Sequence, residues 1–190
     1  NAGIVAGDAE HTPFTGAFLP LVGEGKHGPD AELVAAGNRD VVLRGHRIGR
    51  YGKQLIEVTG ETSLAGRKVA EPGLAPPAQV PLGRQRLRGE IVDSKCWFGV
   101  MKPGQGKAHK DCAVRCISGG APPAFVVRAA GPRGDERTLI LLLVAADGRS
   151  IAARILDLVA EPVEIEGEVS RLGDQLVLST DPASIRRIDG

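Results

Sequence analysis

The chain has 190 residues, enough for one large or two small domains with hydrophobic cores. Its 24 basic and 23 acidic residues nearly cancel and form no basic block, which argues against a nucleic-acid partner. No apolar run approaches the roughly 18 residues that a membrane-spanning helix needs, so we expect no transmembrane segment in this chain. Aromatic residues make up only 3%, whereas 26 glycines and 13 prolines indicate many turns and short strands.

The amino-terminal part is expected to be a small β unit preceded by an arm. The chain does not begin with Met, so we expect a trimmed terminus, from which a signal peptide or membrane anchor was removed or at which the chain was simply cut. Residues 1–15 show no periodicity and suggest an extended arm. Short apolar segments follow at 18–22 and 31–36. Residues 41–58 alternate around a Tyr51-Gly52 turn, which predicts a hairpin.

The domain division follows from a change in composition. Residues 71–82 are rich in proline and have no periodicity, so we expect a linker there. The linker separates residues 1–70, the arm and small β unit, from a second domain at 83–190.

Residues 83–190 are expected to form mainly β structure. Strands are predicted at 87–92, 124–130, 138–145 and 163–179, the last a hairpin; residues 151–159 favour a short helix, and 184–188 close the chain. The nearly continuous apolar run within 138–145 predicts a strand buried on both faces. Short bent strands with one inserted helix indicate a small OB-like antiparallel barrel.

The two predicted hairpins resemble each other. Residues 41–58 and 163–179 share a strand glycine, an arginine before the turn and a Gly-Lys/Asp-Gln-Leu sequence after it. A strand glycine followed by a glycine turn is typical of a strongly bent ribbon. The similarity fits a true repeat and equally fits two hairpins that obey the same turn rules.

The chemistry of the chain is concentrated between residues 89 and 123. This segment holds all three cysteines, Cys96, Cys112 and Cys116, together with His109. A strand ending near residue 92 delivers Cys96, and a Gly/Pro-rich loop follows. Residues 107–118 read as a helix that ends at Gly-Gly and Pro-Pro. On that helix His109, Cys112 and Cys116 stand at i, i+3 and i+7 and share one face.

This segment also resembles a group of largely uncharacterised bacterial envelope proteins with OB-like domains. The shared pattern is Gly-x-x-Val-Asp-x-x-Cys, a Gly-rich loop, His-x-x-Cys-Ala-x-x-Cys and Gly-Gly-x-Pro. The matching positions are Gly89, Val92, Asp93, Cys96, His109, Cys112, Ala113, Cys116, Gly119, Gly120 and Pro122. The resemblance covers about 35 residues. It implies an envelope location and an OB-like fold, and it carries no activity.

Four interpretations of the cysteines remain open. A closed site of Cys96, His109, Cys112 and Cys116 would suit zinc. Thiolates also select Cu(I), and Met101 could add a thioether. Alternatively, Cys96 forms a structural disulfide with one of the other two cysteines, and no metal binds. Lastly, two cysteines could form a redox-active dithiol, although no Cys-x-x-Cys motif is present.

Several neighbouring residues have a structural and a functional interpretation. Asp93 and Lys95 could tune a thiolate, although an aspartate at a strand end is usually a turn former. Trp97 and Phe98 are expected to be core anchors or to mark a docking surface. The two histidines at positions 27 and 46 lie in a loop and a hairpin, where we expect solvated side chains rather than ligands.

The sequence thus favours a non-enzymatic, extracytoplasmic protein, periplasmic or membrane-associated. We expect an accessory or metal-binding module that works beside a membrane-associated or redox complex. The alternatives are a scaffold stabilised by a disulfide and a thiol-disulfide or metal-dependent redox protein.

Overall fold

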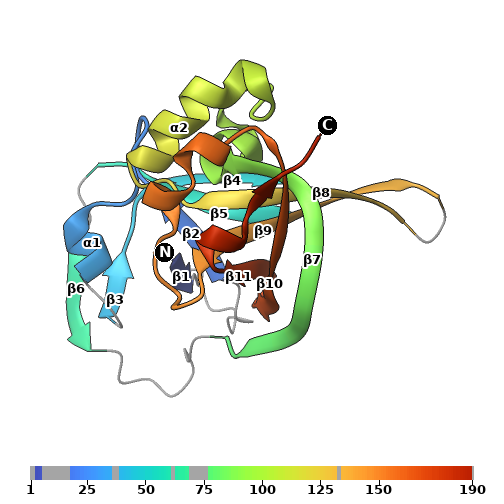
Figure 1. The fold of residues 1–190 in the computed structure, drawn as a ribbon. Helices are drawn as coiled ribbons and strands as arrows, with labels where there is room; N and C mark the ends of the chain where they lie inside the picture. The colour runs from blue at the N-terminus through green and yellow to red at the C-terminus, as the bar shows by residue number, and fades with distance from the viewer. Residues whose placement is uncertain are drawn as a thin grey trace.

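A computed structural model describes residues 3–5, 18–35, 39–60, 63–68, 77–131 and 134–189 of the chain (Figure 1). The described part is mainly β, as expected. Its largest element is a six-stranded sheet, accompanied by a four-stranded and a two-stranded sheet.

The six-stranded sheet comes from the carboxyl-terminal half of the chain. Its strands are β7 (Gln79–Asp93), β8 (Pro123–Ala130), β9 (Glu136–Ala145), β10 (Pro162–Leu172), β11 (Gln175–Thr180) and β12 (Arg186–Arg187). They pair in the order β11-β9-β8-β7-β10-β12, and β11 also pairs with β10. The series of pairings that starts at β7 therefore runs through β8, β9, β11 and β10 and returns to β7.

One pair in this sheet departs from the expected antiparallel arrangement, because β11 runs parallel to β9, with Leu176 opposite Leu141. The other pairings are antiparallel. The parallel pair follows from the odd number of strands in this closed series. Five strands that pair in a closed series cannot alternate in direction throughout, so at least one neighbouring pair has to be parallel.

Strand β7 is long and bends around the sheet, as Figure 1 shows. Its register with β10 shifts between Val169 and Ser170, next to Gly83, which has a φ of +88°. At Gly89 a Cβ atom would lie 2.1 Å from the carbonyl oxygen of Val126 on β8. Only glycine allows β7 and β8 to approach this closely. The strand therefore delivers its last residues, including Asp93, to a fixed place.

The main hydrophobic core lies inside the bent sheet. It includes the almost fully buried Ile91, Phe125, Leu143, Ile165 and Leu178. Residues 140–145 of β9 are buried without alternation, which confirms the expected burial on both faces, although Leu139 before them is 43% exposed. Where a helix was expected at 151–159, two short 3-10 helices, η3 (Ala152–Arg154) and η4 (Leu156–Leu158), pack on this core. A further 3-10 turn, η5 (Pro182–Ser184), precedes β12.

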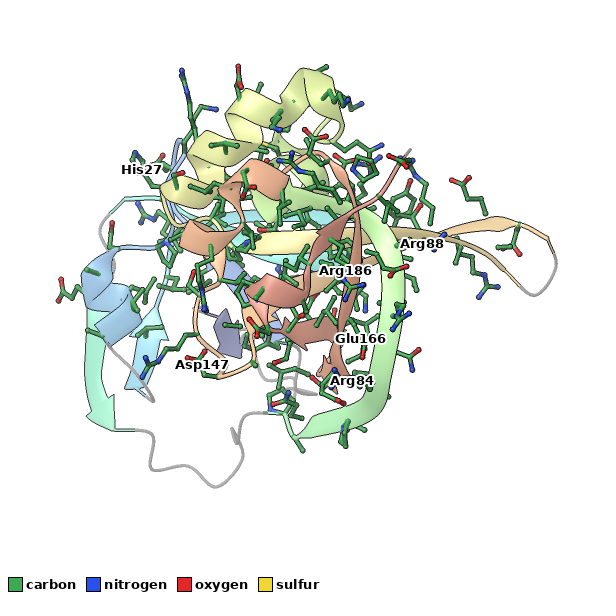
Figure 2. The ribbon with its side chains drawn as sticks, viewed as in Figure 1. His27, Arg84, Arg88, Asp147, Glu166 and Arg186 are labelled. Carbon is green, nitrogen blue, oxygen red and sulfur yellow. The ribbon has the colours of Figure 1, made fainter. Side chains whose placement is uncertain are left out.

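Paired charges line the outer side of β7 and β10. Arg84 Nε donates to Glu166 Oε1 at 2.7 Å, and Arg86 and Arg88 make similar cross-strand bonds to Glu166 and Glu164. Figure 2 labels Arg84, Arg88 and Glu166 along these strands. The arginines are more than half exposed, so these pairs contribute little to stability.

The amino-terminal unit is built on the four-stranded sheet. Its elements are β1 (Gly3–Val5), β2 (Phe18–Val22), α1 (Ala31–Ala35), β4 (Gly45–Arg50) and β5 (Lys53–Val58). The expected hairpin around Tyr51 and Gly52 is β4–β5. Its first strand is shorter than expected, because β3 (Arg39–Val42) belongs instead to a separate pair with β6 (Ser63–Lys68). Of the expected linker, residues 71–76 lie outside the described part, and β7 already begins at Gln79.

The two units share a pattern of pairing. In the amino-terminal unit the order is β1-β2-β5-β4, with β2 and β5 parallel. In the second unit β8-β9-β11-β10 repeats this order, with β9 and β11 parallel. The units also share one hydrophobic cluster, in which Val22 and Leu55 pack with Val92, Trp97 and Cys116. The cysteine-bearing segment therefore lies between the two units.

Candidate metal centre

The cysteine-bearing segment connects β7 to β8. It consists of a helical turn η1 (Cys96–Val100), a loop, a 3-10 turn η2 (Lys107–His109) and the helix α2 (Lys110–Ser118). His109 ends η2 and caps α2, so His109, Cys112 and Cys116 follow one continuous helical path, as their spacing predicts. The helix stops where expected, since Gly120 has a φ of +103° and Ala121 N donates to Cys116 O at 2.9 Å, the closing bond of a glycine-terminated helix.

The structure brings the four sequence-predicted ligands together. One potential ligand atom each from Cys96, His109 and Cys112 lies within 4.8 Å of the others. Cys96 Sγ also lies 4.0 Å from Cys116 Sγ. All three cysteines are free thiols. A second group within the same limit joins Asp93, Cys96 and Cys116, so Cys96 is common to both groups.

Asp93 is fully buried and holds two parts of this cluster. Its Oδ1 accepts a hydrogen bond from the backbone N–H of Cys96 at 2.7 Å, the contact expected of a turn-forming aspartate. Its Oδ2 lies 3.2 Å from Nε2 of the buried His109. The carboxylate thereby ties the end of β7 to the start of α2. Spacing alone gave no indication of the second contact.

Cys112 is the most accessible of the three thiols, and two other side chains touch it. Lys26 Nζ lies 2.7 Å from Cys112 Sγ and donates to it. Met101 Sδ lies 3.6 Å from the same sulfur. The hydrogen bond to Cys112 raises the pKa of Lys26, and the electrostatic influence of the nearby cysteines adds to this rise. The Met101 contact was anticipated; the Lys26 contact, from a loop 86 positions away, was not.

Lys26 lies in the loop of residues 23–30 between β2 and α1, here called the Lys26 loop. Close glycine contacts hold this loop against the end of α2. Gly28 N donates to Gly119 O at 2.8 Å. A Cβ atom at Gly119 would lie 1.9 Å from Lys26 O, and one at Gly28 would lie 2.5 Å from Gly120 O. Figure 2 shows His27 beside α2. Its side chain is exposed, as is that of His46, which agrees with their expected solvation.

Lys95 does not tune the neighbouring thiol. Its ammonium group is turned toward the amino-terminal unit, where it donates to Gly23 O and Gly25 O at 2.7 Å each. It also forms an ion pair of 2.5 Å with Glu57 Oε1. A lysine side chain that is 2% exposed needs such partners, because an unpaired buried charge is costly. Lys95 is thus a link between the two units.

The two deepest thiols are electrostatically unequal. A hydrogen bond from Cys96 lowers the pKa of Cys116 to about 7, and the nearby Lys26 charge assists against the effect of burial. The same hydrogen bond, together with burial and the Asp93 charge, raises the pKa of Cys96. The pair therefore favours one thiolate, at Cys116, stabilised by the Cys96 thiol.

Trp97 and Phe98 are core residues, each 1% exposed, so they offer no docking surface. Their rings meet edge to face at 5.3 Å. Arg50 covers Trp97 from the β4–β5 hairpin: its Nη1 donates to Trp97 O at 3.1 Å, and its guanidinium lies 5.0 Å from the ring centroid. These contacts fix η1, and with it the position of Cys96.

Comparisons with known proteins add no assignment: no protein-family model matches the chain, and no curated protein matches it either. Among the described residues, no helix is both long enough and apolar enough to cross a membrane.

Proposed function

We propose that this protein is an extracytoplasmic metal-binding module, an accessory subunit of a membrane-associated or redox complex, with zinc or copper as its metal. Cys96, His109, Cys112 and Cys116 are the ligands. The observation that carries the proposal is that Cys96 belongs to two groups of potential ligand atoms, each within 4.8 Å of one another, one with His109 and Cys112 and the other with Asp93 and Cys116. Soft ligands of this kind suit both metals.

The spacing of the sulfurs supports a shared metal. Two thiolates at about 2.3 Å from one tetrahedral zinc lie roughly 3.8 Å apart. The sulfurs of Cys96 and Cys116 are separated by 4.0 Å, close to that value. A disulfide would need them at about 2.05 Å.

The surroundings of His109 also support ligation. Histidine ligands in proteins commonly donate their second N–H to a carboxylate, which fixes the ring and its tautomer. Asp93 is placed to accept such a bond from Nε2. Nδ1 then keeps its lone pair for a metal.

The wider parts of the proposal rest on fold and pattern. The order of pairing, in which β11 joins both β9 and β10, supports an OB-like barrel for the second unit. The resemblance of residues 89–123 to envelope proteins supports the extracytoplasmic location and a membrane-associated partner. Four protein ligands would fill the coordination sphere of a tetrahedral metal, which supports a binding role rather than catalysis, because a catalytic metal keeps one position free of protein ligands.

The test is a joint measurement of metal and thiols. We expect protein purified under reducing conditions and loaded with zinc or Cu(I) to hold one ion per chain. Its three thiols should be protected from alkylation until a chelator is added. Cys112→Ser should lower metal content and the Tm together, because metal binding and folding are coupled.

A specific alternative is a disulfide or redox pair of Cys96 and Cys116, favoured by their proximity and by the lowered pKa of Cys116. In that case the protein holds no metal and shows one free thiol per chain. Cys112→Ser then leaves the Tm unchanged, whereas Cys116→Ser lowers it by the equivalent of about 2–5 kcal/mol. Such a result would replace the metal proposal.

A further inference from the structure

The four ligands are unequally buried, so the cluster has an open side. Cys96, His109 and Cys116 are 3%, 4% and 1% exposed. Cys112 is only partly buried, and Met101 beside it is 45% exposed. Met101 and Cys112 are therefore the sulfurs of the cluster that are most accessible to solvent, and an ion from solvent meets them first.

The geometry of this side fits joint coordination by both sulfurs. Met101 Sδ and Cys112 Sγ are 3.6 Å apart, a separation that one ion of about 2.3 Å bond length can bridge. Met101 is the only methionine of the chain, and its side chain is exposed rather than packed in a core. A thioether on the surface next to a thiol is poorly explained by packing.

The chemistry of a thioether selects among metals. It is a neutral, polarisable donor that binds Cu(I) well, whereas structural zinc sites are built from thiolate and imidazole. The Lys26 ammonium group also favours Cu(I) over a divalent ion. It donates a hydrogen bond to Cys112, and its positive charge repels a divalent ion at this outer position more strongly than a monovalent one.

We propose that the cluster handles Cu(I), with Met101 and Cys112 as the outer pair that receives the ion and passes it to and from the buried Cys96 and Cys116. The inference rests on the proposed function and names its metal. Each transfer is a ligand exchange without a redox step. Cu(I) keeps its bond to Cys112 while the buried thiols replace Met101, and each thiol that binds the ion releases its proton to solvent.

The experiment compares Met101→Leu with the wild type under anaerobic, reducing conditions. Leucine keeps the size and apolar character but removes the sulfur. Cu(I) is titrated against a chromophoric Cu(I) chelator, and the rate at which excess chelator withdraws the ion is recorded. Zinc is titrated separately against a zinc indicator. Val100→Leu is the matched control, because Val100 is the adjacent residue and is 43% exposed.

We expect Met101→Leu to slow Cu(I) withdrawal or weaken Cu(I) binding by on the order of tenfold, the lower end of the effect of groups that assist metal ligands. Zinc binding and the Val100→Leu control should be unchanged. Identical Cu(I) behaviour in Met101→Leu and wild type, or equal losses for both metals, would overturn the inference while leaving the metal site intact. A wild-type protein that binds neither ion would instead remove the proposed function itself.

Discussion

At the scale of single residues, the cysteine cluster is organised by what lies beside each sulfur. Cys116 is deep but has a hydrogen-bond donor in Cys96, and Cys112 is shallow but has an ammonium group in Lys26. The first contact favours a thiolate at Cys116. At this residue the metal-free protein is therefore prepared to bind a cation, since less free energy is needed to remove the proton of the Cys116 thiol.

The lowered pKa of Cys116 makes a prediction about pH. The pKa falls from 9.0 to about 7 in the folded chain. Below about 7 both the folded and the unfolded chain hold the proton, so the shift adds no stability. Between about 7 and 9 the unfolded chain binds more protons, and the free energy of unfolding rises with pH. We expect the Tm of reduced, metal-free wild type to rise relative to Cys116→Ser over this interval.

The control for this measurement is Cys112→Ser, which retains the pair of Cys96 and Cys116. Its Tm difference from Cys116→Ser should show the same rise. A constant difference across the interval would mean that Cys116 titrates in the folded chain as it does in the unfolded chain.

At the scale of elements, the contact between the Lys26 loop and α2 is the one most sensitive to size. Gly119 leaves no room for a side chain beside Lys26 O. We expect Gly119→Ala to push the loop away, lowering the free energy of unfolding by about 1–3 kcal/mol, as overpacking does. Chemical denaturation measures the loss, and the modification rate of Lys26 by an amine reagent should rise.

Ser118→Ala serves as the control, because Ser118 is the exposed neighbour at the end of α2. It should leave both measurements unchanged. An unaltered Lys26 rate in Gly119→Ala would show that the loop does not depend on this close approach.

The elements also show what sequence alone could reveal. The helix with His109, Cys112 and Cys116 was predictable because helical spacing and a Gly-Gly stop act locally. The parallel pairing of β9 and β11 was not, because it follows from closing a series of five strands. Likewise, nothing near Lys26 or Lys95 indicates their partners, which lie in another unit of the chain. The sequence left open whether the two similar hairpins are a true repeat, and the matching order of pairings in both units favours the repeat.

At the scale of the molecule, the two units are joined by the buried Lys95. We expect Glu57→Gln to lower the free energy of unfolding by about 3 kcal/mol, because it leaves the Lys95 charge without its counter-ion. The two units should still unfold in one transition, which circular dichroism and tryptophan fluorescence of Trp97 can compare. Glu24→Gln, at an exposed position in the same unit, should have no effect.

Two separate transitions in the wild type would argue against a single cooperative structure. A loss in Glu57→Gln no larger than that in Glu24→Gln would show that the two glycine carbonyls alone can compensate Lys95.

The placement of Lys26 has a consequence for the order of events during synthesis. The residues that cover the cysteine cluster emerge from the ribosome 86 positions before Cys112, so they have to wait for their partner. Until the helix arrives and docks, the thiols have no cover. In an oxidising compartment, docking of the helix competes with disulfide formation during this interval. A chain in which a disulfide forms first can retain its sheets and still lack a working cluster.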